Sequence, residues 1–155
     1  MPDPVREAIN GDVAAPGTAL VAPGNFHMRL LRMGSRYQVT VADGPLVCYQ
    51  RPAVDVLFDS IAETGAAGVV GVLLTGMGSD GALGLKRMKD AGARTIAQDE
   101  RSCAVFGMPR EAVRAGAVEE VLPLDRIASR LIAHLTERAS PVKPPATHRG
   151  CVRFL

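Results

Sequence analysis

Residues 69–97 have the sequence VVGVLLTGMGSDGALGLKRMKDAGARTIA, in which an apolar run leads through a glycine-rich loop into a helical pattern. Residues 69–74 are apolar on both faces and rich in β-branched side chains, which is typical of a buried parallel strand. We expect a helix over residues 82–91, ended by Gly92, and a short strand over residues 94–97. Strand, loop, helix and strand in this order predict a right-handed βαβ unit.

The chain before this unit indicates a strand, a hairpin and a helix. A short strand is expected over residues 18–22, which are bounded by proline and glycine. Residues 26–33 and 36–42 flank a Gly-Ser dipeptide and predict an antiparallel hairpin with a two-residue turn. A helix is expected to begin at Pro52, because proline is favoured at the first helical position.

After the unit, we expect a helix near residues 109–115, a strand near residues 119–122 and a final helix over residues 124–137. These elements predict the α/β class, with a mostly parallel sheet flanked by helices and an antiparallel hairpin near the start. Because the chain begins with a loop, we expect an incomplete doubly wound domain. Residues 1–139 should form this domain, and the proline-rich residues 140–155 should form a disordered tail.

Composition excludes several classes of protein. The length of 155 residues suits one domain, and a net charge of +2 with mixed signs indicates no nucleic-acid partner. No apolar run approaches the roughly 18 residues of a membrane span, and the N-terminus does not resemble a signal peptide, so we expect a cytoplasmic protein without membrane insertion. The three cysteines and three histidines stand at no metal-ligand spacing, so neither a metal nor a disulfide framework is expected.

The loop of residues 75–81 is the candidate for chemistry, since ligands of α/β sheets bind at the carboxyl ends of parallel strands. Asp80 near its end allows three interpretations. It could cap the helix that follows, orient a histidine as in Ser-His-Asp hydrolysis, or stand beside a phosphate bound at the helix N-terminus. The negative charge of Asp80 and the lack of a P-loop or dinucleotide motif argue against the phosphate. The other two interpretations stay open on spacing alone.

Four segments, in order and at matching spacing, resemble signatures of the CheB-type chemotaxis methylesterases. They are Ala22-Pro23-Gly24 with His27-Met28, RPAVDVLF at residues 51–58, LLTGMGSDGA at residues 73–82, and QDE at residues 98–100 with CAVFGMP at residues 103–109. The resemblance covers about residues 5–135. It implies a protein-glutamate methylesterase of bacterial chemotaxis, a phosphorelay signalling pathway, that hydrolyses glutamate methyl esters on the cytoplasmic helices of chemoreceptors. Many members of the family also deamidate receptor glutamines.

The resemblance also implies the site residues. The family uses a Ser-His-Asp triad, and Asp80 matches the position of its aspartate. Met77 matches the position whose backbone N–H belongs to the oxyanion hole, where a donor meets the developing negative charge. No cofactor and no metal are implied.

The chain departs from the family in lacking the triad serine and histidine. In the family the serine lies in a Gly-x-Ser-Thr-Gly-Gly turn and the histidine in a Gln-His-Met-Pro segment, and neither motif occurs here. His27 is not at the position of the catalytic histidine and is expected to be an ordinary strand or loop residue. The receiver domain that usually precedes the catalytic domain is absent too, so we expect a fragment of the catalytic domain.

The partners expected from this interpretation are chemoreceptor helices and a second copy of the chain, the latter through apolar surface and strand edges of the incomplete sheet. An alternative is a truncated, non-catalytic pseudoenzyme that binds receptor helices without cleaving them.

Overall fold

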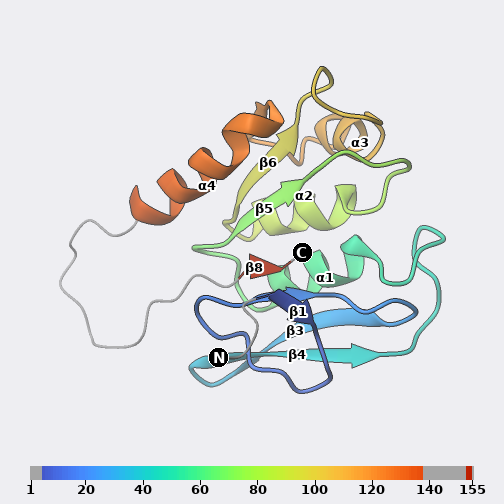
Figure 1. Ribbon diagram of the computed structural model, residues 1–155, viewed down its shortest axis with the longest axis vertical. Coiled ribbons are helices and arrows are strands. Elements are labelled where there is room, and N and C mark those ends of the chain that lie inside the picture. The colour runs from blue at the N-terminus through green and yellow to red at the C-terminus, as the bar shows by residue number, and fades with distance from the viewer. Residues whose placement is uncertain (1–4, 138–152, 155) are drawn as a thin grey trace.

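The computed structural model describes residues 5–137 and 153–154 (Figure 1). The strands are β1 (Val5–Glu7), β2 (Ala19–Val21), β3 (His27–Met33), β4 (Arg36–Ala42), β5 (Val70–Leu73), β6 (Arg94–Gln98), β7 (Glu120–Leu122) and β8 (Arg153–Phe154). The helices are α1 (Val54–Glu63), α2 (Ala82–Asp90), α3 (Met108–Arg114) and α4 (Leu124–Glu137). None of these helices is both long enough and apolar enough to cross a membrane.

A three-stranded parallel sheet in the order β5-β6-β7 confirms the predicted βαβ unit. Val72 of β5 pairs with Ile96 of β6, and Ala97 of β6 pairs with Val121 of β7. Helices α2 and α3 pack against β5 and β6, and α4 packs against β6. Figure 1 shows α4 on one side of this sheet and α2 and α3 on the other. The α/β class with helices flanking parallel strands is therefore confirmed.

The N-terminal half adds two smaller sheets. Strands β3 and β4 form the predicted antiparallel hairpin, with Met33 paired to Arg36 across the Gly-Ser turn. The parallel strands β1, β2 and β8 form the other sheet. Strand β1 was not expected, because it has three residues and the two at its ends are exposed, so it carries no hydrophobic pattern. Most of the predicted tail lies outside the described residues, and only Arg153–Phe154, paired with β2, is described there.

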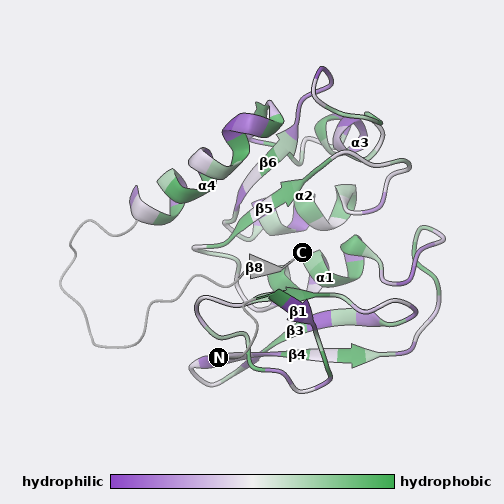
Figure 2. Ribbon diagram, viewed as in Figure 1, coloured by the Kyte–Doolittle hydropathy of each residue, from purple (hydrophilic) through white to green (hydrophobic). Residues whose placement is uncertain are grey.

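Helix α1 lies between the hairpin and α2 (Figure 1) and packs against two hydrophobic clusters, which it joins. One cluster lies under the hairpin and includes Leu30 and Val39 with Leu57 of α1. The other lies between β5 and helices α2 and α3 and includes Leu73 and Leu85. Phe58 of α1 packs against both clusters. Figure 2 shows β5 coloured as hydrophobic, and its residues alternate between half-buried and buried. Helix α4 alternates between hydrophobic and hydrophilic turns.

The last helix is attached to the sheet by a part-buried cluster of His134, Arg130 and Glu120. The His134 ring lies in the interior, with its Nε2 2.6 Å from Glu120 Oε1 on β7. Arg130 Nε donates to the other oxygen of Glu120 at 2.7 Å. The Arg130 guanidinium and, less strongly, the His134 ring hold the pKa of Glu120 below its ordinary value. This cluster fixes the rotation of α4 about its axis, because His134 and Arg130 lie one turn apart on the same face.

We predict that Glu120→Gln destabilises the chain by about 1 kcal/mol at pH 7, because it removes the charge that strengthens both hydrogen bonds. The folded-state pKa of Glu120 is lowered, so its contribution is present above the unfolded pKa and is lost as the pH falls through the folded one. Urea unfolding of the wild type and the variant should therefore differ at pH 7, and the difference should shrink as the pH falls below the folded-state pKa. Glu63→Gln, which removes the exposed Arg29 pair, is the control and should change little at either pH. A difference that persists at low pH would contradict the prediction.

Candidate functional site

The glycine-rich loop of residues 75–81 leaves the carboxyl end of β5 and is hydrogen-bonded to the segment that leads into α3. The Gly76 N–H donates to Val105 O at 3.0 Å, and Gly76 O accepts the N–H groups of Gly107 and Met108 at 3.1 and 2.8 Å. The Thr75 hydroxyl donates to Val105 O and accepts the Val105 N–H. These bonds hold the two loops side by side across 30 residues of sequence.

Gly107 is required for this close approach. A Cβ atom at position 107 would lie 2.6 Å from Gly76 O and 3.1 Å from Gly78 N, closer than a side chain can be placed without moving the backbone. The φ angle of Gly107 is −105°, which any residue adopts, so the requirement is steric. Only glycine at this position therefore lets the two loops approach this closely.

Gln98, at the end of β6, holds the base of the loop from the interior. Its side chain is 1% exposed, and its Oε1 accepts the Thr75 N–H at 2.9 Å. Its Nε2 donates to Ser102 O at 2.8 Å. The amide thus links the ends of two neighbouring parallel strands, β5 and β6, at the edge where α/β folds place their ligands.

Asp80 lies 5% exposed at the end of the loop, and both of its oxygens accept backbone N–H groups from α1. Oδ2 accepts from Val54 at 2.8 Å and Oδ1 from Asp55 at 2.9 Å. The alternative that Asp80 caps the helix after it is wrong, since α2 has Gly81 as its N-cap and no side-chain cap bond. The same contact explains why α1 begins at Val54 and not at Pro52. Its N-cap, Ala53, has no capping side chain, and Asp80 supplies the acceptors instead.

Asp55 returns the contact to α2. Its buried carboxylate accepts the N–H of Gly84 through Oδ1 at 2.7 Å, and Gly84 lies in the first turn of α2. We call these three bonds, from Val54 and Asp55 to Asp80 and from Gly84 to Asp55, the reciprocal cap. The first turn of α1 thus receives its acceptors from Asp80, in the loop before α2, and the first turn of α2 receives one from Asp55 of α1.

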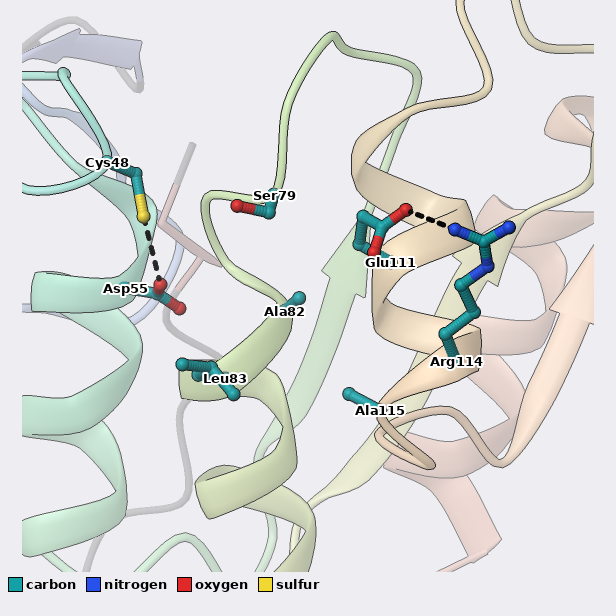
Figure 3. A pocket seen from close by; sticks show the side chains of 8 residues that line it. All are labelled: Cys48, Asp55, Ser79, Ala82, Leu83, Glu111, Arg114 and Ala115. Atoms are coloured by element: carbon teal, nitrogen blue, oxygen red, sulfur yellow. Dashed lines mark hydrogen bonds and ion pairs between the residues drawn. The ribbon is translucent and has the colours of Figure 1, made fainter.

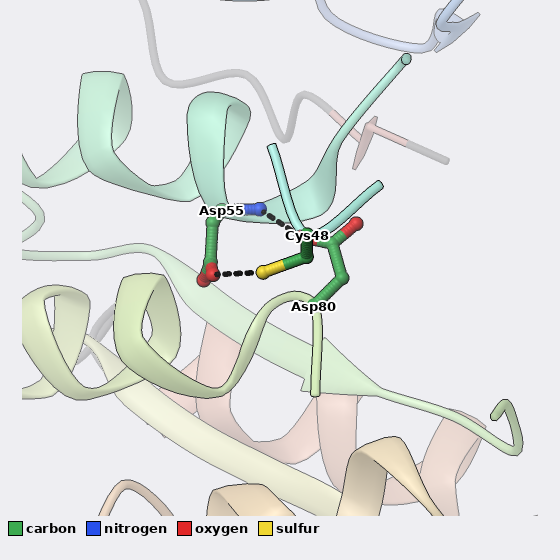
Figure 4. A group of neighbouring side chains, drawn as sticks. All are labelled: Cys48, Asp55 and Asp80. Atoms are coloured by element: carbon green, nitrogen blue, oxygen red, sulfur yellow. Dashed lines mark hydrogen bonds between the residues drawn. The ribbon is translucent and has the colours of Figure 1, made fainter. Parts of the chain in front are cut away.

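Cys48 completes the group around the two carboxylates (Figure 4). Its Sγ lies 3.8 Å from Asp55 Oδ2, and one ligand atom each of Cys48, Asp55 and Asp80 lie within 4.8 Å of one another. Burial first, and then the two negative charges, raise the pKa of the Cys48 thiol. Burial first, and the charge of Asp80 among the further causes, also raise the pKa of Asp55. A thiol under these conditions is a hydrogen-bond donor and a poor nucleophile.

The sulfur and oxygen atoms of this group are ligand types that zinc accepts. Three of the four carboxylate oxygens, however, accept a backbone N–H as described, and the fourth lies next to the Cys48 thiol. The hydrogen bonds therefore account for the arrangement without an ion. Nothing in the sequence around Asp55 distinguishes it from an ordinary first-turn helix acid, and neither it nor Cys48 was expected at the site.

Met77, the residue that the resemblance assigns to the oxyanion hole, lies at the outer tip of the loop. Its side chain is 84% exposed. Within residues 5–137 its backbone N–H donates to no protein acceptor, so a donor is available there. A pocket of about 340 Å³ lies beside the loop, over the first turn of α2 (Figure 3). Its lining consists of Cys48, Asp55, Ser79, Ala82, Leu83, Glu111, Arg114 and Ala115.

The two histidines within residues 5–137 belong to the scaffold. His27 is buried, with Nε2 2.7 Å from Pro45 O and Nδ1 3.3 Å from Ala53 N, so the ring proton lies on Nε2. The expectation that His27 is an ordinary strand residue is confirmed. His134 is bonded to Glu120 as described above. Neither ring is hydrogen-bonded to Asp80.

A sequence profile of the family described as CheB methylesterase matches residues 2–131. The chain belongs to the CheB methylesterase family. A solved structure, the CheB methylesterase catalytic domain of Thermotoga maritima, has the same fold with a TM-score of 0.80 and 36% sequence identity, covering 83% of this chain and 68% of that domain.

Curated relatives carry two activities in their names. Protein-glutamate methylesterase/protein-glutamine glutaminase 2 of Syntrophus aciditrophicus (strain SB) is 57% identical over 128 residues, which cover 83% of this chain and 37% of that protein. The enzyme numbered 4 of Anaeromyxobacter dehalogenans (strain 2CP-C) is 58% identical over 127 residues, which cover 82% of this chain and 36% of that protein. The chain thus spans just over a third of the length of the curated relatives that it matches.

We predict that Gly107→Ala destabilises the chain by about 1–3 kcal/mol, because the new methyl group must displace the loop at Gly76. Denaturant unfolding of the chain measures this directly. Gly24→Ala is the matched control, since a Cβ there meets nothing within 4 Å and its φ angle is not positive. Equal stability of the two variants would show that the two loops are not held at this distance.

Proposed function

We propose that this chain provides Asp80 as the carboxylate of a Ser-His-Asp triad in a protein-glutamate methylesterase, with the serine and the histidine on a segment that the chain does not contain. The observation that carries the proposal is the position of Asp80 at the carboxyl end of β5, with both oxygens held by backbone N–H groups of α1. A carboxylate has about four lone-pair sites. Two remain after these bonds, enough to accept the N–H of a histidine.

In the proposed reaction, the serine hydroxyl attacks the carbonyl carbon of a glutamate methyl ester while the histidine takes its proton. The Met77 N–H donates to the carbonyl oxygen as it becomes negative. The histidine returns the proton to the departing methoxide, methanol leaves, and water hydrolyses the acyl-serine to give glutamate. Asp80 keeps the imidazole in the right tautomer and stabilises its positive charge. A glutamine side chain would follow the same course with ammonia as the leaving group.

The proposed substrates are the cytoplasmic helices of chemoreceptors, which places the enzyme in the cytoplasm. The exposed position of Met77 leaves room for a large helical partner to bring a side chain to its N–H. Adaptation of the receptors in a phosphorelay pathway and self-association through the incomplete sheet remain part of the proposal.

The test uses an enzyme completed with the preceding segment of the Syntrophus aciditrophicus relative and measures methanol release from methylated receptor. Asp80→Ala should lower kcat by about 10⁴-fold, the usual cost of losing the triad carboxylate, with a smaller effect on KM. The same substitution should also cost about 1–3 kcal/mol of stability for each of the two N–H groups that it leaves without an acceptor, so activity is measured well below the unfolding temperature.

Asp90→Ala is the control, since Asp90 is an exposed residue of α2 whose one ion pair within residues 5–137 is with Lys86. It should leave kcat within about twofold. Wild-type activity of the Asp80 variant in the completed enzyme would show that Asp80 is not the triad carboxylate.

A further inference from the structure

The first turn of a helix contains backbone N–H groups that have no acceptor within the helix. In α1 these include the N–H groups of Val54 and Asp55, and in α2 the N–H of Gly84. All three donate to carboxylates from elsewhere in the chain, at 2.7 to 2.9 Å. Asp55 takes part twice, as a backbone donor to Asp80 and as a side-chain acceptor for Gly84.

These bonds close a ring. Asp80 stands immediately before α2, and its oxygens are oriented by the first turn of α1. The first turn of α1 is itself held on α2, because the Asp55 carboxylate accepts the Gly84 N–H. A loss of the Asp55–Gly84 bond would let the start of α1 move relative to α2, and the donors that orient Asp80 would move with it. We propose that Asp55 is a positioning residue for the Asp80 carboxylate, an inference that gives Asp55 a role in the function proposed above.

The packing of the two helices supports this role. A Cβ atom at Gly84 would lie 2.9 Å from Asp55 Oδ1 and 3.1 Å from Asp55 Cα. Glycine therefore lets α1 approach α2 until the Asp55 carboxylate reaches the Gly84 N–H. The Cys48 thiol lies 3.8 Å from the other carboxylate oxygen of Asp55 (Figure 4).

The bond from Gly84 needs an oxygen acceptor and no negative charge. Asp55→Asn can keep it, since an amide oxygen accepts an N–H and the amide NH₂ can turn toward Cys48 Sγ. Asp55→Ala removes it. Ser60→Ala is a matched control on the same helix: Ser60 is fully buried, its Oγ accepts the Leu30 N–H at 2.8 Å, and it lies toward the other end of α1. Loss of a buried acceptor costs a similar amount of stability in both alanine variants.

Amide hydrogen exchange of the chain itself, followed by NMR, tests the geometry. In the wild type, the amides of residues 54, 55 and 84 should exchange at least 100-fold more slowly than that of Leu83, an exposed first-turn residue of α2. This measurement needs no variant, and fast exchange at residue 84 would overturn the inference. Asp55→Ala should speed exchange at residue 54 at least tenfold more than Ser60→Ala does, whereas Asp55→Asn should stay within about threefold of the wild type. Equal effects of the two alanine variants would overturn it as well.

The completed enzyme separates this inference from the function on which it rests. Asp55→Ala should lower kcat at least tenfold with KM within twofold, Asp55→Asn should restore most of kcat, and Ser60→Ala should change kcat less than threefold. If Asp80→Ala abolishes activity and the Asp55 and Ser60 alanine variants behave alike, Asp55 is only structural and the proposed function stands. If Asp80→Ala is active, the proposed function fails whatever the Asp55 variants do.

Discussion

Two buried carboxylates accept backbone N–H groups from the first turns of two helices in the interior of this domain. Asp80 accepts the N–H groups of residues 25 and 26 positions before it in the chain, and Asp55 accepts an N–H from the helix that follows Asp80. The N-cap residues Ala53 and Gly81 form no side-chain cap bond. Without the reciprocal cap, buried N–H groups would be left unpaired at the start of both helices, at a cost of about 1–3 kcal/mol each. Because α1 joins the two hydrophobic clusters, this contact also sets how they are placed relative to each other.

The reciprocal cap also explains how two acids can share a small buried volume. Oxygen atoms of the two carboxylates lie within 4.8 Å of each other, so their negative charges repel. Burial first, and this repulsion among the further causes, disfavour the charged form of Asp55 and raise its pKa. Backbone N–H groups at helix N-termini carry partial positive charge and offset part of that penalty. Asp80 receives two such donors and Asp55 one, with the Cys48 thiol on its remaining oxygen. The partial positive charges at the N-termini of α1 and α2 thus offset part of the negative charge of the two carboxylates.

Periodicity was sufficient to predict most of the fold. The run at residues 69–74, the hairpin and the last helix each repeat one pattern over enough residues to identify their class, and their bounds agree with the structure to within a residue or two. Strand β1 was missed because three residues with exposed ends have no pattern. At the site, the position of Asp80 was predictable from its motif, but its partners were not. Ala53 carries no capping signal, and a contact across 25 residues follows from packing that no local pattern encodes.

A residue that caps a helix and a residue that orients a histidine need the same property, a carboxylate whose direction does not change. A catalytic group gains from being held in advance, because the reaction then pays no cost of reorganisation. In this fold that rigidity comes from the scaffold: α1 and α2 fix Asp80, while Gln98 and Gly107 fix the loop that carries Met77. All of these contacts lie within residues 5–137. In the enzyme proposed above, a segment bearing a serine and a histidine would meet the Asp80 carboxylate and the Met77 N–H already held in place, and would itself contribute the nucleophile and the base.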